Sequence, residues 1–132
     1  MGKFNSFEEI EAWKESRLLI QKIRSICKKK NVVRDFSFVD QITRASRSIA
    51  ANIAEGNDSM NPLEFITFLG YAKRSAAEVR SHLYDALDEG YIDEGEFTVL
   101  NEQSKKIARM LSNLASYLQT CDLKQKRIAN AL

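Results

Sequence analysis

The chain has 132 residues, a length typical of one domain that buries its own core without disulfide or metal support. With 44% hydrophobic and 29% charged residues it is not a disordered chain, and its formal net charge of +2 is too small to indicate nucleic-acid binding by itself. No apolar run approaches the roughly 18 residues of a membrane span, and the first residues lack the apolar centre of a secretory signal.

One proline and five glycines leave few interruptions, so the sequence predicts long helices. Ser6 and Glu9 have the spacing of a capping box, which predicts a first helix over about residues 7–30. After a break at residues 31–36, a second helix is expected over about 37–55, with Gly56 as its left-handed stop.

Two strong start signals follow. Asn61, Pro62 and Glu64 predict a third helix over about residues 62–89, which Gly90 ends. Asp93 with Glu96 predicts a fourth helix over about 94–121, followed by a short basic tail at 122–132. Apolar residues recur at spacings of three and four in every helix, and no segment alternates as a strand would. We therefore predict an all-α protein in which residues 1–121 form one antiparallel up-down-up-down four-helix bundle.

Some apolar residues lie outside the core stripe of their helix. Single exposed apolar side chains are ordinary, but two aligned side stripes on consecutive helices are typical of a subunit interface. The sequence therefore predicts a homo-oligomer, in which several copies bury these side chains against one another. The predicted interface residues are Leu18, Ile66, Tyr84, Val99, Met110 and Tyr117.

A row of polar residues follows the flank of the second helix, and another follows the flank of the third. In an antiparallel hairpin the facing pairs are Arg44 with Glu78, Ser48 with Ser75, and Asn52 with Tyr71. Two interpretations are open: a structural seam that fixes how the helices pack, which we favour, or a groove for a ligand or RNA. The predicted seam consists of Arg44, Ser48, Asn52, Glu55, Ser75 and Glu78.

Charge is segregated along the chain. Basic residues gather at the end of the first helix, whereas residues 81–104 contain acids and no Lys or Arg. Both groups fall at the same end of the predicted bundle, where they can neutralise one another. Other basic residues are candidates for phosphate contacts, and the chain has no motif that reads base sequence, so any binding should be electrostatic and salt-sensitive. These candidates are Lys73, Arg80, Lys105, Lys106, Arg109, Lys124, Lys126 and Arg127.

The sequence does not predict an enzyme. His82 is the single histidine, and Glu78 precedes it by four residues rather than the three of bundle di-iron sites. Phosphate-binding loops and nucleophile elbows are absent. Cys27 and Cys121 fall at opposite ends of the predicted bundle, too far apart for a disulfide, which fits a reducing cytoplasm. We therefore expect a non-enzymatic cytoplasmic protein without metal or cofactor.

The runs Gln41-Ile42-Thr43-Arg44-Ala45 and Asn52-Ile53-Ala54-Glu55-Gly56 resemble the signature of the bacterial four helix bundle protein family, which includes the 23S ribosomal RNA intervening-sequence proteins. The similarity covers roughly residues 6–120, with Arg74 where the family commonly has glycine. It implies a homopentameric bundle without an agreed activity. The accessory proteins of diversity-generating retroelements form a structurally related branch, which implies a reverse transcriptase as an alternative partner, whereas the Asn-Ile-Ala-Glu-Gly run is more similar to the intervening-sequence branch.

Two hypotheses follow from these observations. The first is an oligomeric scaffold associated with RNA or an RNP through basic surface residues. The alternative is a structural or protein-interaction module without nucleic-acid binding, such as an accessory protein that binds a reverse transcriptase.

Overall fold

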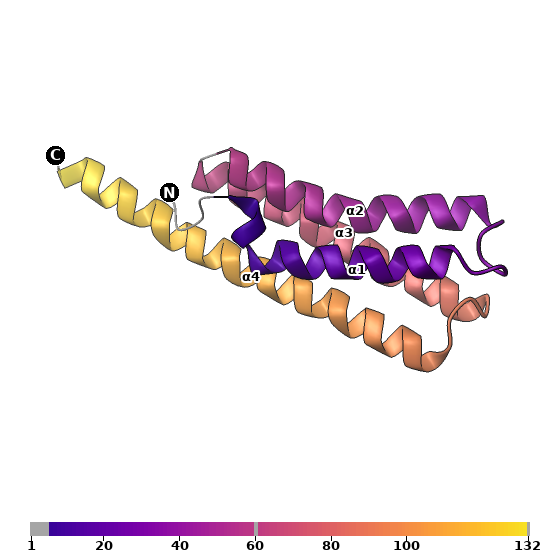
Figure 1. Cartoon of the computed structure of the whole chain (residues 1–132). Coiled ribbons are helices and arrows are strands. Elements are labelled where there is room, and N and C mark those ends of the chain that lie inside the picture. The colour runs from indigo at the N-terminus through magenta and orange to yellow at the C-terminus, as the bar shows by residue number, and fades with distance from the viewer. Residues whose placement is uncertain (1–5, 60, 132) are drawn as a thin grey trace.

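The computed structural model describes residues 6–59 and 61–131, and within these ranges every regular element is a helix. The elements are a short 3-10 helix η1 (Phe7–Glu9), α1 (Glu11–Cys27), α2 (Phe36–Asp58), α3 (Pro62–Asp88) and α4 (Glu94–Ala131). The four long helices run side by side in alternating directions (Figure 1). Each packs against its neighbours in sequence, and α1 also packs against α4, so α2 and α4 lie diagonally across the bundle. The predicted four-helix bundle is confirmed.

Local signals set the starts of α3 and α4 and the end of α3. The Asn61 side chain accepts hydrogen bonds from the backbone N–H groups of Leu63 (2.9 Å) and Glu64 (3.3 Å). Asp93 and Glu96 form a reciprocal capping box, in which Asp93 Oδ1 accepts from Glu96 N (2.7 Å) and Glu96 Oε1 accepts from Asp93 N (3.2 Å). Gly90 follows α3 with φ of 75°, a conformation that favours glycine. These three predictions are confirmed.

The capping box predicted at Ser6 and Glu9 is wrong. Ser6 makes no side-chain cap, η1 forms in its place, and α1 begins only at Glu11 because Ile10 is extended (φ −78°, ψ 120°). Ile10 is 2% exposed, so burial of its side chain accompanies this break. At its other end α1 stops at Cys27, three residues earlier than predicted, and Val32 in the following loop is fully buried.

Gly56 does not stop the second helix, contrary to our prediction. It lies within α2, which continues to Asp58, and Ser59 follows with its hydroxyl donating to the Gly56 carbonyl (2.6 Å). A Cβ on Gly56 would lie 2.8 Å from Phe65 Cδ1 and 2.9 Å from Phe68 Cβ. Glycine is therefore required here by the close approach of α2 and α3, not by a left-handed turn.

The last helix is longer than predicted. Instead of ending near Cys121, α4 continues to Ala131, since this stretch contains no glycine or proline and Lys126 pairs with Asp122 one turn earlier (3.2 Å). The residues expected to form a basic tail are thus helical up to Ala131. Figure 1 shows this end of α4 running past the other helices, and Leu123 and Ile128 on it are exposed. We call residues 123–131 the α4 overhang.

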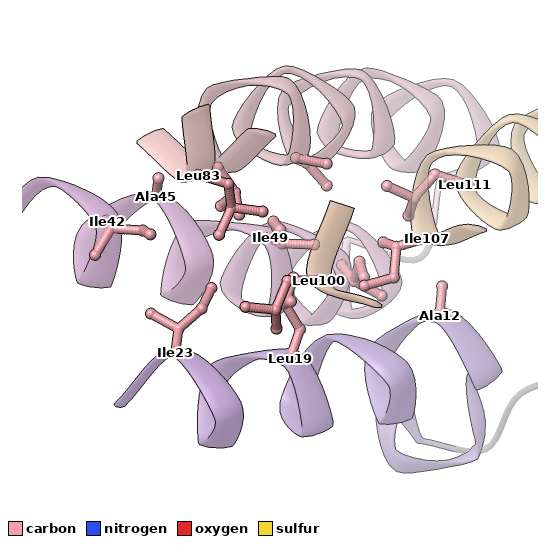
Figure 2. Packing of buried hydrophobic residues seen from close by; sticks show 14 of the residues in the cluster. Ala12, Leu19, Ile23, Ile42, Ala45, Ile49, Leu83, Leu100, Ile107 and Leu111 are labelled. Carbon is pink, nitrogen blue, oxygen red and sulfur yellow. The ribbon is translucent and has the colours of Figure 1, made fainter. Parts of the chain in front are cut away.

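The core follows the axis of the bundle and receives side chains from all four helices. Figure 2 shows the labelled core residues converging between the helices, among them Leu19, Ile23, Ile42, Ile49, Leu83, Ile107 and Leu111. Three buried serines let the helices approach closely without an unpaired hydroxyl. Ser16 and Ser104 donate to carbonyls one turn earlier (2.7 and 2.9 Å), and Ser46 donates to the Thr43 carbonyl (3.0 Å).

Candidate functional site

The centre of the predicted polar seam forms between α2 and α3. The Ser75 hydroxyl donates to Ser48 Oγ (2.9 Å), and Asn52 Nδ2 donates to Ser48 Oγ (3.0 Å) and to the Ser48 carbonyl (2.8 Å). All three residues are half-buried. Ser48 Oγ thus accepts from Asn52 on its own helix and from Ser75 on α3, and a contact of this kind fixes the register of the two helices.

The outer members of the seam pair within their own helices. Arg44 Nε donates to Asp40 Oδ1 (3.1 Å), and Glu78 Oε2 lies 3.5 Å from His82 Nε2, an ion pair only if the imidazole is protonated. Glu55 is exposed. The seam is therefore a three-residue contact rather than a continuous polar groove along α2 and α3.

One lysine of the basic cluster is neutralised at the acidic end of the bundle. Lys29 Nζ contacts both carboxylate oxygens of Glu96 (3.0 and 3.3 Å) and the Tyr91 carbonyl (3.1 Å), which ties the end of α1 to the start of α4. The Tyr91 hydroxyl donates to Asp35 Oδ2 (2.6 Å), and its ring packs edge-on against Phe38 at 5.2 Å. The shared proton lowers the pKa of Asp35 and raises that of Tyr91 to about 12.

Two of the eight candidate phosphate-binding residues share a groove between α3 and α4. Lys73 and Arg80 line it, together with Arg74, whose guanidinium lies 5.9 Å from the centre of the Tyr71 ring. Ala108 supplies the α4 wall. Arg74 was missing from our predicted set, although its position beside Lys73 on an exposed helix face was a sufficient signal.

The three candidates at the middle of α4 are partly engaged by carboxylates. Lys106 Nζ contacts Glu15 Oε1 at 2.7 Å, and Lys105 lies 3.7 Å from Glu102. Arg109 shares a groove between α1 and α4 with Lys106 and Glu15. Pairing reduces the positive potential that Lys105 and Lys106 can offer a phosphate.

The remaining candidates, Lys124, Lys126 and Arg127, lie exposed on the α4 overhang, where Lys126 pairs with Asp122. The eight predicted residues are thus distributed over three surfaces.

The predicted interface residues form two patches, one on each side of α4. Leu18 and Val99, 50% and 55% exposed, line the groove between α1 and α4. Met110 and Tyr117 continue the row of Val99 along α4, with Met110 half-buried and Tyr117 exposed.

The second patch lies on the α3 side of α4. Tyr84 is 55% exposed, and its ring packs against Phe97 at 4.7 Å. Ile66 lies five helical turns earlier on the same face of α3 and is half-buried. The structure therefore separates residues that the sequence had placed in a single set.

A third groove, between α1 and α2, was not singled out by the sequence analysis. Arg24, Lys28 and Arg47 line it together with Cys27 and other residues. The available signal was the absence of acids from residues 16–34 and 41–54, which are the segments that bring these cations together.

The thiols and the acids offer little further chemistry. Cys27 and Cys121 are free, and burial raises the pKa of the Cys27 thiol. Across residues 6–59 and 61–131, no three His, Cys, Asp or Glu side chains are grouped so that they could hold a metal ion. Within the same part of the chain, every helix is too short or too polar to cross a membrane.

The chain is similar to a known protein family and to solved structures. Residues 8–113 match the family described as 23S rRNA-intervening sequence protein. The fold is similar to the crystal structure of a protein of unknown function from the S23 ribosomal protein family of Bacteroides thetaiotaomicron, with a TM-score of 0.70 and 24% identity over 79% of this chain and 97% of that chain. No curated protein matches the chain.

Proposed function

The chain belongs to the 23S rRNA-intervening sequence protein family, and we propose that it is a non-enzymatic, cytoplasmic, homo-oligomeric scaffold that associates with RNA through basic surface residues. The observation that carries the proposal is the pair of apolar patches on opposite sides of α4. A ring needs two different complementary surfaces on each subunit, whereas a two-fold dimer needs only one. The copy number of five is what the family resemblance implies.

The α1/α4 patch is the stronger half of this argument. Leu18 and Val99 are branched aliphatic side chains on facing helices, and both are about half exposed beside the same groove. Burying such side chains is worth roughly 25 cal/mol for each Å² removed from water. The second patch, at Tyr84 and Ile66, supplies the surface of a neighbouring copy against which they would pack.

Two arguments support the association with RNA: the family to which the chain belongs and the repetition of weak sites. In one copy the α3/α4 groove offers Lys73, Arg74 and Arg80, which suits a few phosphate contacts of low affinity. Lys73 and Arg80 lie on the face of α3 between Ile66 and Tyr84, so in the assembly these contacts form at the edge of the second patch. An oligomer repeats the groove in every copy, so contacts that are individually weak act together.

A specific observation also favours the alternative, a protein-interaction module. The end of the bundle near the α3–α4 loop exposes several carboxylates, which could dock a basic protein such as a reverse transcriptase. These exposed acids are Asp85, Asp88, Glu89, Asp93 and Glu94.

Sedimentation velocity tests the oligomer. We expect the wild-type chain to sediment as a closed assembly at micromolar concentration and Val99→Glu to shift it to the monomer. Val33→Glu is the matched control, because Val33 is 45% exposed in the loop between α1 and α2 and belongs to neither patch. A wild-type monomer, or equal effects of the two substitutions, would contradict the proposed interface.

Titration of a labelled RNA hairpin tests the association with RNA. Binding should be measurable at about 50 mM salt and much weaker at about 200 mM. Val99→Glu should weaken binding as well, because a monomer presents each groove only once. If the wild-type assembly does not bind RNA even at low salt, the protein-interaction alternative replaces the RNA scaffold.

A further inference from the structure

The groove between α1 and α2 is lined by three cations that lack partners. Arg24, Lys28 and Arg47 are all exposed, and none of their side chains makes an ion pair or hydrogen bond within the described residues. Lys29 and Lys106, by contrast, are engaged by Glu96 and Glu15. The positive charge of this groove is therefore not neutralised by a neighbouring carboxylate and can attract an external anion.

The chain segments that build this groove contain no compensating acids. Between Glu15 and Asp35 there is no Asp or Glu, and the same holds between Asp40 and Glu55. Asp40 itself is paired with Arg44. The charge of the α1/α2 groove is therefore positive in spite of the small net charge of the chain.

The floor of the groove is uncharged. It consists of Val39, Thr43 and Cys27, with Cys27 Sγ 4.0 Å from Thr43 Oγ1. Burial keeps the pKa of the Cys27 thiol above its ordinary value, so at neutral pH the thiol carries no negative charge that would repel an anion. The groove measures about 230 Å³, less than the roughly 300–1,000 Å³ typical of small-molecule pockets, and it suits a phosphate of a chain that passes across the surface.

The groove also remains open in the proposed oligomer. Both apolar patches flank α4, and α2 lies diagonally across the bundle from α4. The α1/α2 groove and the α3/α4 groove therefore lie on opposite sides of each subunit. A ring built through the flanks of α4 leaves Arg47 on α2 accessible.

We propose that the α1/α2 groove is a binding site for the phosphodiester backbone of RNA, held by Arg24, Lys28 and Arg47. This inference rests on the proposed association with RNA and assigns it to a surface other than the α3/α4 groove. Arginine binds phosphate with two parallel N–H donors, and lysine adds a point charge. Contacts of this kind read the backbone and leave base sequence unread.

The test measures the salt dependence of RNA binding for two triple variants of the full chain. R24Q/K28Q/R47Q removes the cations of the α1/α2 groove, and K73Q/R74Q/R80Q removes the same charge from the α3/α4 groove. Each lost phosphate contact lowers the slope of log K against log salt by about 0.7–0.9. If one subunit makes these three contacts, raising salt from 50 to 200 mM should weaken RNA binding by the wild type about 20- to 40-fold more than it weakens binding by R24Q/K28Q/R47Q.

The charge-retaining variant R24K/K28R/R47K is the second control and should keep the wild-type slope. Five of the six substituted positions are exposed and Arg80 is half-buried, so circular dichroism should show folded chains. The inference is overturned if R24Q/K28Q/R47Q binds RNA like the wild type, or if polyglutamate of equal charge competes as well as RNA. Loss of binding in K73Q/R74Q/R80Q alone would overturn it while leaving the proposed function intact, and no RNA binding by the wild type would overturn both.

Discussion

Substituting Gly56 with alanine tests whether α2 and α3 pack as closely as the structure shows. Within a helix, glycine is less favourable than alanine by about 1 kcal/mol, so the substitution would stabilise α2 if space were available. Here the added Cβ would lie 2.8 Å from Phe65 Cδ1 and 2.9 Å from Phe68 Cβ. Phe65 is fully buried, and Phe68 Cβ is attached directly to the backbone of α3, so neither can yield unless the helices move apart.

Gly70 provides a matched control because it is also helical, yet a Cβ there meets no atom within 4 Å. Gly70→Ala should stabilise the chain by about 0.4–1 kcal/mol. Gly56→Ala gains the same propensity but suffers an overpacking cost of about 1–3 kcal/mol. Because both substitutions gain the same helix propensity, the difference between their free energies of unfolding measures the packing cost alone.

Thermal unfolding followed by circular dichroism at one protein concentration measures this difference, since assembly makes Tm depend on concentration. For a chain of this size, 1 kcal/mol corresponds to about 3–5 °C in Tm. Gly70→Ala should therefore melt above the wild type and Gly56→Ala below it. If the two variants melt at the same temperature, α2 and α3 do not approach as closely as described, and the reasoning fails.

Three further predictions concern other contacts. Tyr91→Phe should raise the pKa of Asp35 in a carboxyl NMR titration, because the Tyr91 hydrogen bond is the main cause of its lowering. The stabilisation from this pair is present above the unfolded pKa of Asp35 and is lost as pH falls through the folded one, so the variant should lose it at neutral pH. Ser75→Ala removes one hydrogen bond and should cost about 0.5–1.5 kcal/mol in urea unfolding. Ser48→Ala should cost more because it removes two, those from Ser75 and Asn52 to Ser48 Oγ, although Asn52 keeps its bond to the Ser48 carbonyl. Deleting the chain from Leu123 onward should change the free energy of unfolding by less than about 0.5 kcal/mol, because the α4 overhang buries little.

Each of these has a clear contrary result. An unchanged Asp35 titration in Tyr91→Phe would show that another group lowers its pKa. Equal unfolding midpoints for the Ser48 and Ser75 variants would show that Ser48 is not the shared centre of the seam. A large loss of stability on truncation would show that the α4 overhang packs against the bundle in solution.

The parts of the fold that could be predicted are those that local chemistry decides. Asn61 and Asp93 cap their helices with side-chain oxygens that reach only two or three residues along the chain, so sequence spacing suffices. Ile10 and Gly56 were misread because tertiary packing decides them. Burial of the Ile10 side chain accompanies the break before α1, and the fit against α3 requires the glycine in α2.

The same distinction applies to the candidate surfaces. Ser48 and Ser75 could be paired in advance, since facing rows in an antiparallel hairpin fix their register. The partner of Lys106 could not, because Glu15 comes from a helix at the other end of the chain. The location of Arg47 became informative only when α1 and α2 were placed side by side.

The α4 overhang has a practical consequence for any domain joined behind it. A continuous helix advances 1.5 Å and turns through about 100° with each residue. The length of this segment therefore sets both the distance of a joined domain from the bundle and its direction around the helix axis. Inserting or deleting a single residue after Leu123 would rotate such a domain by about 100° around the helix axis. Inserting seven residues would return it to nearly its original direction and move it about 10 Å outward.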